Sequence, residues 1–136
     1  MPPHDPSDSL FDDPAAPASR VRPAPPDDEL VRIGRHLPAS VYLGTSSWSF
    51  PGWRGIVYDD SYSEATLARE GLVAYAQHPL LRLAGIDRSF HQPLPQAVYA
   101  RYAGQVPPGF RFLVKAPARV TDAVVRGERG APAQPN

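Results

Sequence analysis

Residues 41–53, VYLGTSSWSFPGW, are the most informative stretch of this chain. The apolar start of this stretch is typical of a buried strand. The small residues, hydroxyls and indoles that follow suit a loop that shapes a pocket at the end of that strand. Trp48 and Trp53 would serve either as a stacking platform for a base, sugar or other flat ligand, or as plugs that close one end of the core.

Outward from this stretch, the pattern alternates between strands and helices. Short apolar runs predict strands over residues 40–46, 80–87 and 110–115. Helices are predicted over residues 28–37, 63–77, 95–105 and 120–126. Ser63 is the expected N-cap of the helix that ends at about Gln77, and Gly71 weakens that helix. Such alternation predicts an α/β fold with a parallel sheet and crossover helices.

Composition divides the chain into three parts. Residues 1–27 are rich in Pro, Asp and Ala and predict a disordered tail, residues 28–125 predict one partial domain, and residues 126–136 predict a disordered end. The chain holds no cysteine, which excludes disulfides, thiol catalysis and cysteine–metal sites. No apolar run is long enough to cross a membrane, and no signal sequence is present, so we expect a cytoplasmic protein without membrane contact.

Charge is distributed unevenly along the chain. Residues 1–78 hold 6 basic and 11 acidic side chains, whereas residues 79–136 hold 8 basic and 3 acidic ones. This asymmetry indicates an anionic partner for the second half, unless it reflects the ordinary fluctuation of short sequences.

Three motifs in order resemble the YecE-like family, known as domain-of-unknown-function family 72. Residues 44–53, GTSSWSFPGW, follow its opening pattern GTSxWxxPxW. Residues 85–91, GIDRSFH, resemble its second motif, commonly EINxTFY, with substitutions at Gly85, Asp87, Ser89 and His91. Residues 108–117, PGFRFLVKAP, match the third, PxFxFxVKxP, nearly residue for residue.

The resemblance implies a TIM-type barrel of which this chain supplies the N-terminal portion. Family members run to roughly twice this length, so about three of the eight strands of such a barrel would be present. An incomplete barrel leaves open sheet edges. We therefore expect a truncated domain that self-associates or is completed by another chain.

Charged groups follow the ends of two predicted strands. In parallel α/β folds ligands bind at the carboxyl ends of the strands, where this chain places Asp87 and Lys115. One hypothesis assigns them catalytic roles: Lys115 binds an anion or stabilises negative charge, and Asp87 orients Lys115 or acts as a base. The competing interpretation is an ion pair that caps the barrel interior.

The remaining candidate ligand-binding residues flank these strand ends. They are Thr45, Ser46, Trp48, Trp53, Arg88, Ser89, Phe90 and His91. His91 and Asp87 together supply too few ligands for a zinc or manganese site, so we predict no metal, and the sequence assigns no cofactor.

Two classes of function fit these observations. In the first, the strand ends form a polar pocket for hydrolase or lyase chemistry on a phosphate-bearing or sugar-like substrate. In the second, the protein is a nucleic-acid-binding or repair-associated module without catalysis in this chain, by analogy with barrel nucleases. A third hypothesis is that this chain has no activity of its own.

Overall fold

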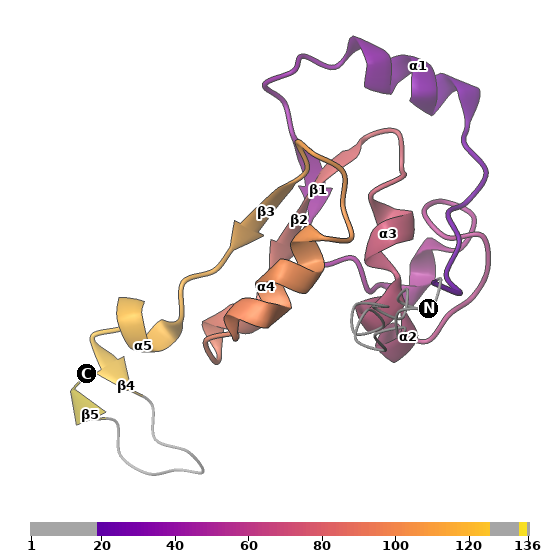
Figure 1. Cartoon of the computed structure of the whole chain (residues 1–136). Helices are drawn as coiled ribbons and strands as arrows, with labels where there is room; N and C mark the ends of the chain where they lie inside the picture. Colours follow the sequence, from indigo (N-terminus) through magenta and orange to yellow (C-terminus); the bar gives the residue numbers. More distant parts are fainter. Residues whose placement is uncertain (1–18, 126–133, 136) are drawn as a thin grey trace, which may run out of the picture.

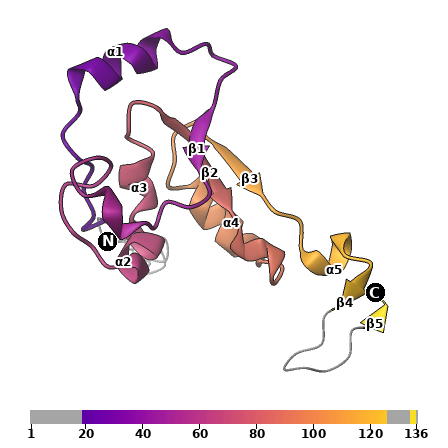
Figure 2. The same cartoon turned by 180° about the vertical axis from the view of Figure 1, so that it is seen from behind.

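The computed structural model of the protein describes residues 19–125 and 134–135. Figure 1 shows the arrangement of its elements, and Figure 2 shows them from behind. In chain order these are α1 (Asp28–His36), β1 (Leu43–Thr45), the 3-10 turn η1 (Pro51–Trp53), α2 (Glu64–Glu70), α3 (Leu72–Tyr75), β2 (Leu81–Ile86), the 3-10 turn η2 (Arg88–Phe90), α4 (Gln96–Ala103), β3 (Arg111–Val114), α5 (Ala118–Thr121), β4 (Val124–Val125) and β5 (Gln134–Pro135).

Strands β1, β2 and β3 form one parallel sheet in that order. Helices α2 and α3 connect β1 to β2, and α4 connects β2 to β3. This is the α/β alternation that the sequence predicts. The sheet is open in the part of the chain that the structure describes, which agrees with the expected portion of a barrel-like domain.

The two faces of this sheet differ in how far they are covered. On one face, Ala84 and Ile86 of β2 are buried in a core that includes Tyr75 of α3 and Tyr102 of α4. On the other face, the side chain of Leu113 is 65% exposed. Parallel sheets in globular proteins are usually covered on both faces, so the face that carries Leu113 is an unusual feature.

The predicted helix from Ser63 to Gln77 is two helices in the structure. The Ser63 hydroxyl accepts a hydrogen bond from the Thr66 amide at 3.2 Å, which confirms Ser63 as the N-cap of α2. The helix is interrupted at Gly71, where an added Cβ would lie 2.6 Å from the Leu67 carbonyl oxygen. A residue with a Cβ would clash there, so this backbone arrangement suits glycine, whose low helix propensity agrees with the break.

Helix α1 is confirmed within one residue of its predicted bounds. The Asp27 carboxylate accepts hydrogen bonds from the amides of Glu29 and Leu30, and the helix ends before Pro38. Figure 1 shows α1 at the end of the sheet where the strands begin. There Arg82 of β2 donates a hydrogen bond to the Gly34 carbonyl at 3.1 Å.

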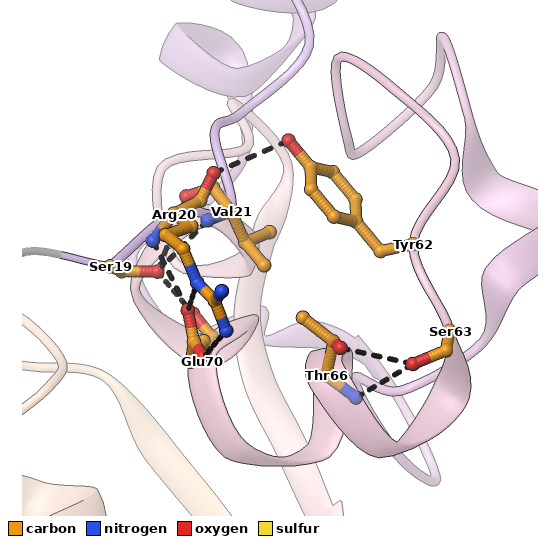
Figure 3. Close-up of polar contacts among 7 residues, drawn as sticks. All are labelled: Ser19, Arg20, Val21, Tyr62, Ser63, Thr66 and Glu70. Carbon is orange, nitrogen blue, oxygen red and sulfur yellow. Dashed lines mark hydrogen bonds and ion pairs between the residues drawn. The ribbon is translucent and has the colours of Figure 1, made fainter.

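The segment that precedes α1 lies against the domain. Composition predicts disorder over residues 1–27; residues 1–18 lie outside the described part, whereas residues 19–27 are placed. Figure 3 shows Ser19 and Arg20 beside Glu70 at the end of α2, with the Ser19 hydroxyl donating to the Glu70 carbonyl at 2.8 Å. The Arg20 guanidinium pairs with the Glu70 carboxylate at 3.0 Å and lowers the pKa of that carboxyl. Val21 is buried and holds this segment against the core. The prediction of disorder rested on the mean composition of residues 1–27, in which one apolar residue has little weight.

Backbone hydrogen bonds continue this attachment. The Asp59 amide donates to the Arg22 carbonyl at 3.1 Å, and the Ala24 amide donates to the Val57 carbonyl at 2.9 Å. Residues 19–27 therefore run beside the loop that follows η1 and are attached to the domain.

The end of the chain departs from the predicted helix over residues 120–126. Helix α5 begins earlier, after Pro117, and ends at Thr121. Strand β4 follows and pairs antiparallel with β5. The helix prediction is wrong at Val124 and Val125, whose β-branched side chains favour a strand. Of the predicted disordered end, residues 126–136, Gln134–Pro135 are placed in β5, and residues 126–133 and 136 lie outside the described residues.

Among the described residues, no helix combines the length and apolarity that a membrane span requires.

Candidate functional site

The carboxyl ends of the three strands meet at one edge of the sheet. Strand pairing aligns Thr45 with Ala84, and Ile86 with Val114. The next residues along each strand, Ser46, Asp87 and Lys115, therefore follow at the same edge. The closeness of β1 and β2 is visible at Gly85, where an added Cβ would lie 2.7 Å from the Ser46 carbonyl oxygen.

Asp87 and Lys115 form an ion pair at this edge. The Lys115 Nζ lies 3.4 Å from the Asp87 Oδ2, and the two side chains are 55% and 48% exposed. The same Nζ lies 6.0 Å above the centre of the Phe90 ring. Both charges thus remain accessible to a ligand from solvent.

Arg88 brings a second cation to the same edge. It begins η2 directly after Asp87, and its Nη1 donates a hydrogen bond to the Tyr102 hydroxyl at 3.1 Å. Tyr102 is buried and belongs to α4. The guanidinium is therefore attached to a fixed side chain on one side and keeps further N–H donors for a ligand.

A pocket of about 240 Å³ opens beside Asp87 and Arg88, and Lys115 lies outside its lining. Its walls come from the loop after β1, the end of β2 and helices α2 and α4. The lining residues are Ser46, Ser47, Trp48, Ser49, Ala68, Gly85, Ile86, Asp87, Arg88 and Tyr102. Of the predicted site residues, the structure therefore brings Ser46, Trp48, Asp87 and Arg88 together around one space.

Thr45 serves the scaffold at this edge. Its amide donates to the Tyr75 hydroxyl at 3.0 Å, and its own hydroxyl donates to the Ser47 carbonyl at 2.7 Å. Tyr75 in turn donates to the Leu83 carbonyl at 2.9 Å. Burial raises the pKa of Tyr75, which keeps this hydroxyl protonated as a donor. Thr45 and Tyr75 together fix the start of the loop.

Ser89 also helps to position the backbone at this edge. Its side chain is fully buried, and its hydroxyl lies 2.8 Å from the Ile86 carbonyl oxygen and 2.7 Å from the Lys115 carbonyl oxygen. It thereby connects the ends of β2 and β3. Because Lys115 follows β3, this contact fixes the backbone that carries the ammonium group.

The two tryptophans differ in their surroundings. Trp48 is buried and packs edge-on against Tyr102, with ring centres 5.0 Å apart. Its indole Nε1 is buried and has no hydrogen-bond partner among the described residues. Trp53 is partly buried between Phe50, at 5.4 Å, and Tyr75, at 6.2 Å. Trp48 is thus buried in the core beside the pocket, whereas Trp53 lies nearer the surface.

Phe90 and His91 lie beside the pocket, outside its lining. The Phe90 ring packs edge-on against His91 at 5.5 Å, and His91 is exposed. Within residues 19–125 and 134–135, no three carboxylate or imidazole side chains are grouped closely enough to hold a metal ion.

Several residues of this edge are not singled out by the sequence. Tyr75 and Tyr102 read as ordinary apolar positions of amphipathic helices, and their hydroxyl contacts depend on how the helices pack. Gly85 could have been identified from the sequence, because a glycine inside an apolar strand indicates close approach of another backbone.

Comparison with known proteins places the chain in a family. The model of the family described as "protein of unknown function DUF72" matches residues 42–134. A comparison with curated proteins gives no match, and neither does a comparison with solved structures. The matched region is more than half of the chain and contains all three strands of the parallel sheet. The chain therefore belongs to the DUF72 family of proteins of unknown function.

Proposed function

We propose that the strand ends bind a small phosphate-bearing or sugar-like substrate, and that hydrolysis or elimination takes place beside Asp87 and Lys115. The observation that supports this proposal is the convergence of Ser46, Asp87, Arg88 and Lys115, from three separate strand ends, at the edge where a pocket of about 240 Å³ opens. Ligands of parallel α/β folds bind at this edge.

The charges favour an anionic group. Arg88 and Lys115 supply two cations beside the carboxylate of Asp87. A guanidinium offers paired donors to phosphate oxygens, and an ammonium adds a mobile point charge. These two cations together attract the anionic part of a substrate.

The ion pair also suits proton transfer. In both hydrolysis and elimination a base removes a proton, from water or from substrate carbon, while negative charge develops on the substrate. The Asp87 carboxylate would accept that proton. The Lys115 ammonium, 3.4 Å away, would stabilise the negative charge.

The exposure of the pair favours this role over a purely structural one. Exposed ion pairs contribute only about 0–1 kcal/mol to stability. Both side chains are about half exposed, so the fold gains little from keeping them together.

Titration with inorganic phosphate tests the proposal. We expect phosphate to shift the backbone amide resonances of residues 46–49, 87–88 and 115 in the full chain. Substitution Lys115→Met should weaken binding about tenfold, because one charged contact is lost. Arg35→Gln on α1, at the opposite end of the sheet, is the matched control and should leave the affinity unchanged. Shifts distributed over all arginines, or none at residues 87–88 and 115, would contradict the proposal.

A salt series separates this function from nucleic-acid binding. Binding of an oligonucleotide weakens steeply with salt because phosphate contacts release counterions. A small substrate held at one pocket should respond mildly. Tight oligonucleotide binding that falls by several orders of magnitude between low and moderate salt would favour the nucleic-acid alternative.

A further inference from the structure

A second and larger pocket lies beside the first. It has a volume of about 570 Å³ and is lined by Thr45, Ser46, Ser47, Ser49, Phe50, Pro51, Trp53 and Glu64. Ser46, Ser47 and Ser49 line both pockets. The loop after β1 is therefore a shared wall between two adjoining spaces.

An exposed aromatic ring is held in place at this second pocket. The Phe50 side chain is 55% exposed, yet its ring packs edge-on against Trp53. The ring also lies over Gly52, where an added Cβ would come within 2.4 Å of the Phe50 Cε1. Trp53 is itself supported by the buried Tyr75. An apolar ring that is both exposed and fixed offers a flat surface to a ligand.

The polar groups of the second pocket favour a neutral ligand with hydroxyl groups. Glu64 is the single charged residue in its lining, so the pocket disfavours anions. A carboxylate accepts hydrogen bonds from hydroxyl groups. The Ser47 and Ser49 hydroxyls lie 2.9 Å apart, and the Ser49 amide donates to the Ser47 hydroxyl at 3.1 Å, which orders this wall.

We propose, building on the function proposed above, that the second pocket holds the neutral ring of a phosphorylated sugar whose phosphate lies near Arg88 and Lys115. The C–H bonds of a sugar ring carry slight positive charge and suit the negative face of Phe50 or Trp53. Glu64 accepts hydrogen bonds from the ring hydroxyls. The shared serine wall lets one molecule extend across both pockets.

The probes are inorganic phosphate, the neutral sugars D-glucose, D-galactose and D-ribose, and the terminal phosphates of these sugars. We expect at least one neutral sugar to shift the Trp53 indole resonance and the amides of residues 49–53 and 64. Its phosphate should shift both these signals and those of residues 87–88 and 115, and should bind at least tenfold more tightly than the neutral sugar or phosphate alone.

Three variants test the assigned contacts. Phe50→Ala and Glu64→Gln should each weaken binding of the sugar phosphate about tenfold and leave inorganic phosphate unaffected. Gly52→Ala keeps the phenyl ring but displaces it, and should weaken sugar binding in the same selective way. Val120→Ala, an exposed apolar residue on α5, is the control and should change neither affinity.

The outcomes separate the two proposals. Phosphate binding at Arg88 and Lys115 without any response to a sugar at Trp53 overturns the sugar pocket and leaves the anion site intact. Absence of both responses overturns both. A sugar phosphate that binds equally well to wild type and to Phe50→Ala also overturns the sugar pocket.

Discussion

The carboxyl edge of the sheet combines two sets of groups that are held very differently. Thr45, Tyr75 and Ser89 are bound to backbone carbonyls or amides at 2.7–3.0 Å, and both Tyr75 and Ser89 are fully buried. Asp87 and Lys115 instead meet at 3.4 Å and are about half exposed. The first set holds the loops in place, whereas the side chains of the second set extend from those loops toward solvent.

This difference has an energetic meaning. Loss of a buried hydrogen-bonding group leaves its partner unsatisfied and costs about 1–3 kcal/mol. Loss of one member of an exposed ion pair costs about 0–1 kcal/mol. Substitutions in the first set should therefore reduce stability, and substitutions in the second should reduce binding.

The largest effect is expected at Gly44, where β1 meets β2. An added Cβ would lie 2.0 Å from the Leu83 carbonyl oxygen, so one strand must shift. Gly44→Ala should lower the free energy of unfolding by about 3 kcal/mol, as overpacking a tight contact does. Urea unfolding monitored by tryptophan fluorescence measures this.

Gly104, at the end of α4, is the matched control for this substitution. An added Cβ there meets no atom closer than 3.5 Å. Gly104→Ala should change stability by about 1 kcal/mol or less. Equal losses at both glycines would mean that the approach of β1 to β2 does not limit the fold.

A smaller loss is expected for Tyr75→Phe. The substitution removes the hydroxyl that serves both Thr45 and the Leu83 carbonyl, while the ring stays packed. We expect a loss of about 2 kcal/mol in the free energy of unfolding. Tyr42→Phe, at an exposed position, should stay within about 0.5 kcal/mol of wild type. If the Tyr75→Phe protein were as stable as wild type, the Tyr75 hydroxyl would not contribute to the stability of this edge.

Much of the fold was accessible from the sequence. Apolar runs located β1, β2 and β3 to within three residues at each end, and the Ser63 cap located α2. The break at Gly71, the strand at Val124 and the attachment of Val21 were not predicted. The attachment of Val21 depends on a core that is distant in sequence, and β4 depends on its pairing with β5, neither of which local periodicity reports. At Gly71 the sequence indicates a weak point in the helix but not that the helix divides there.

The candidate site was predicted in part. The rule that ligands bind at strand ends located Asp87 and Lys115, and their 3.4 Å separation agrees with either interpretation of the pair. The rule does not distinguish a hydroxyl that faces a pocket from one, like that of Ser89, that joins two strands. Phe50 and Glu64 stand out only after the fold brings the loop after β1 beside the start of α2.

The role of Lys115 in binding rather than in stability is decided by measuring the unfolding free energy and the phosphate affinity of Lys115→Met in parallel. We expect stability to fall by no more than about 1 kcal/mol, since the ion pair is exposed, while phosphate affinity falls about tenfold. A stability loss of about 3 kcal/mol with unchanged phosphate affinity would show that Lys115 holds the fold together and would contradict its role in binding.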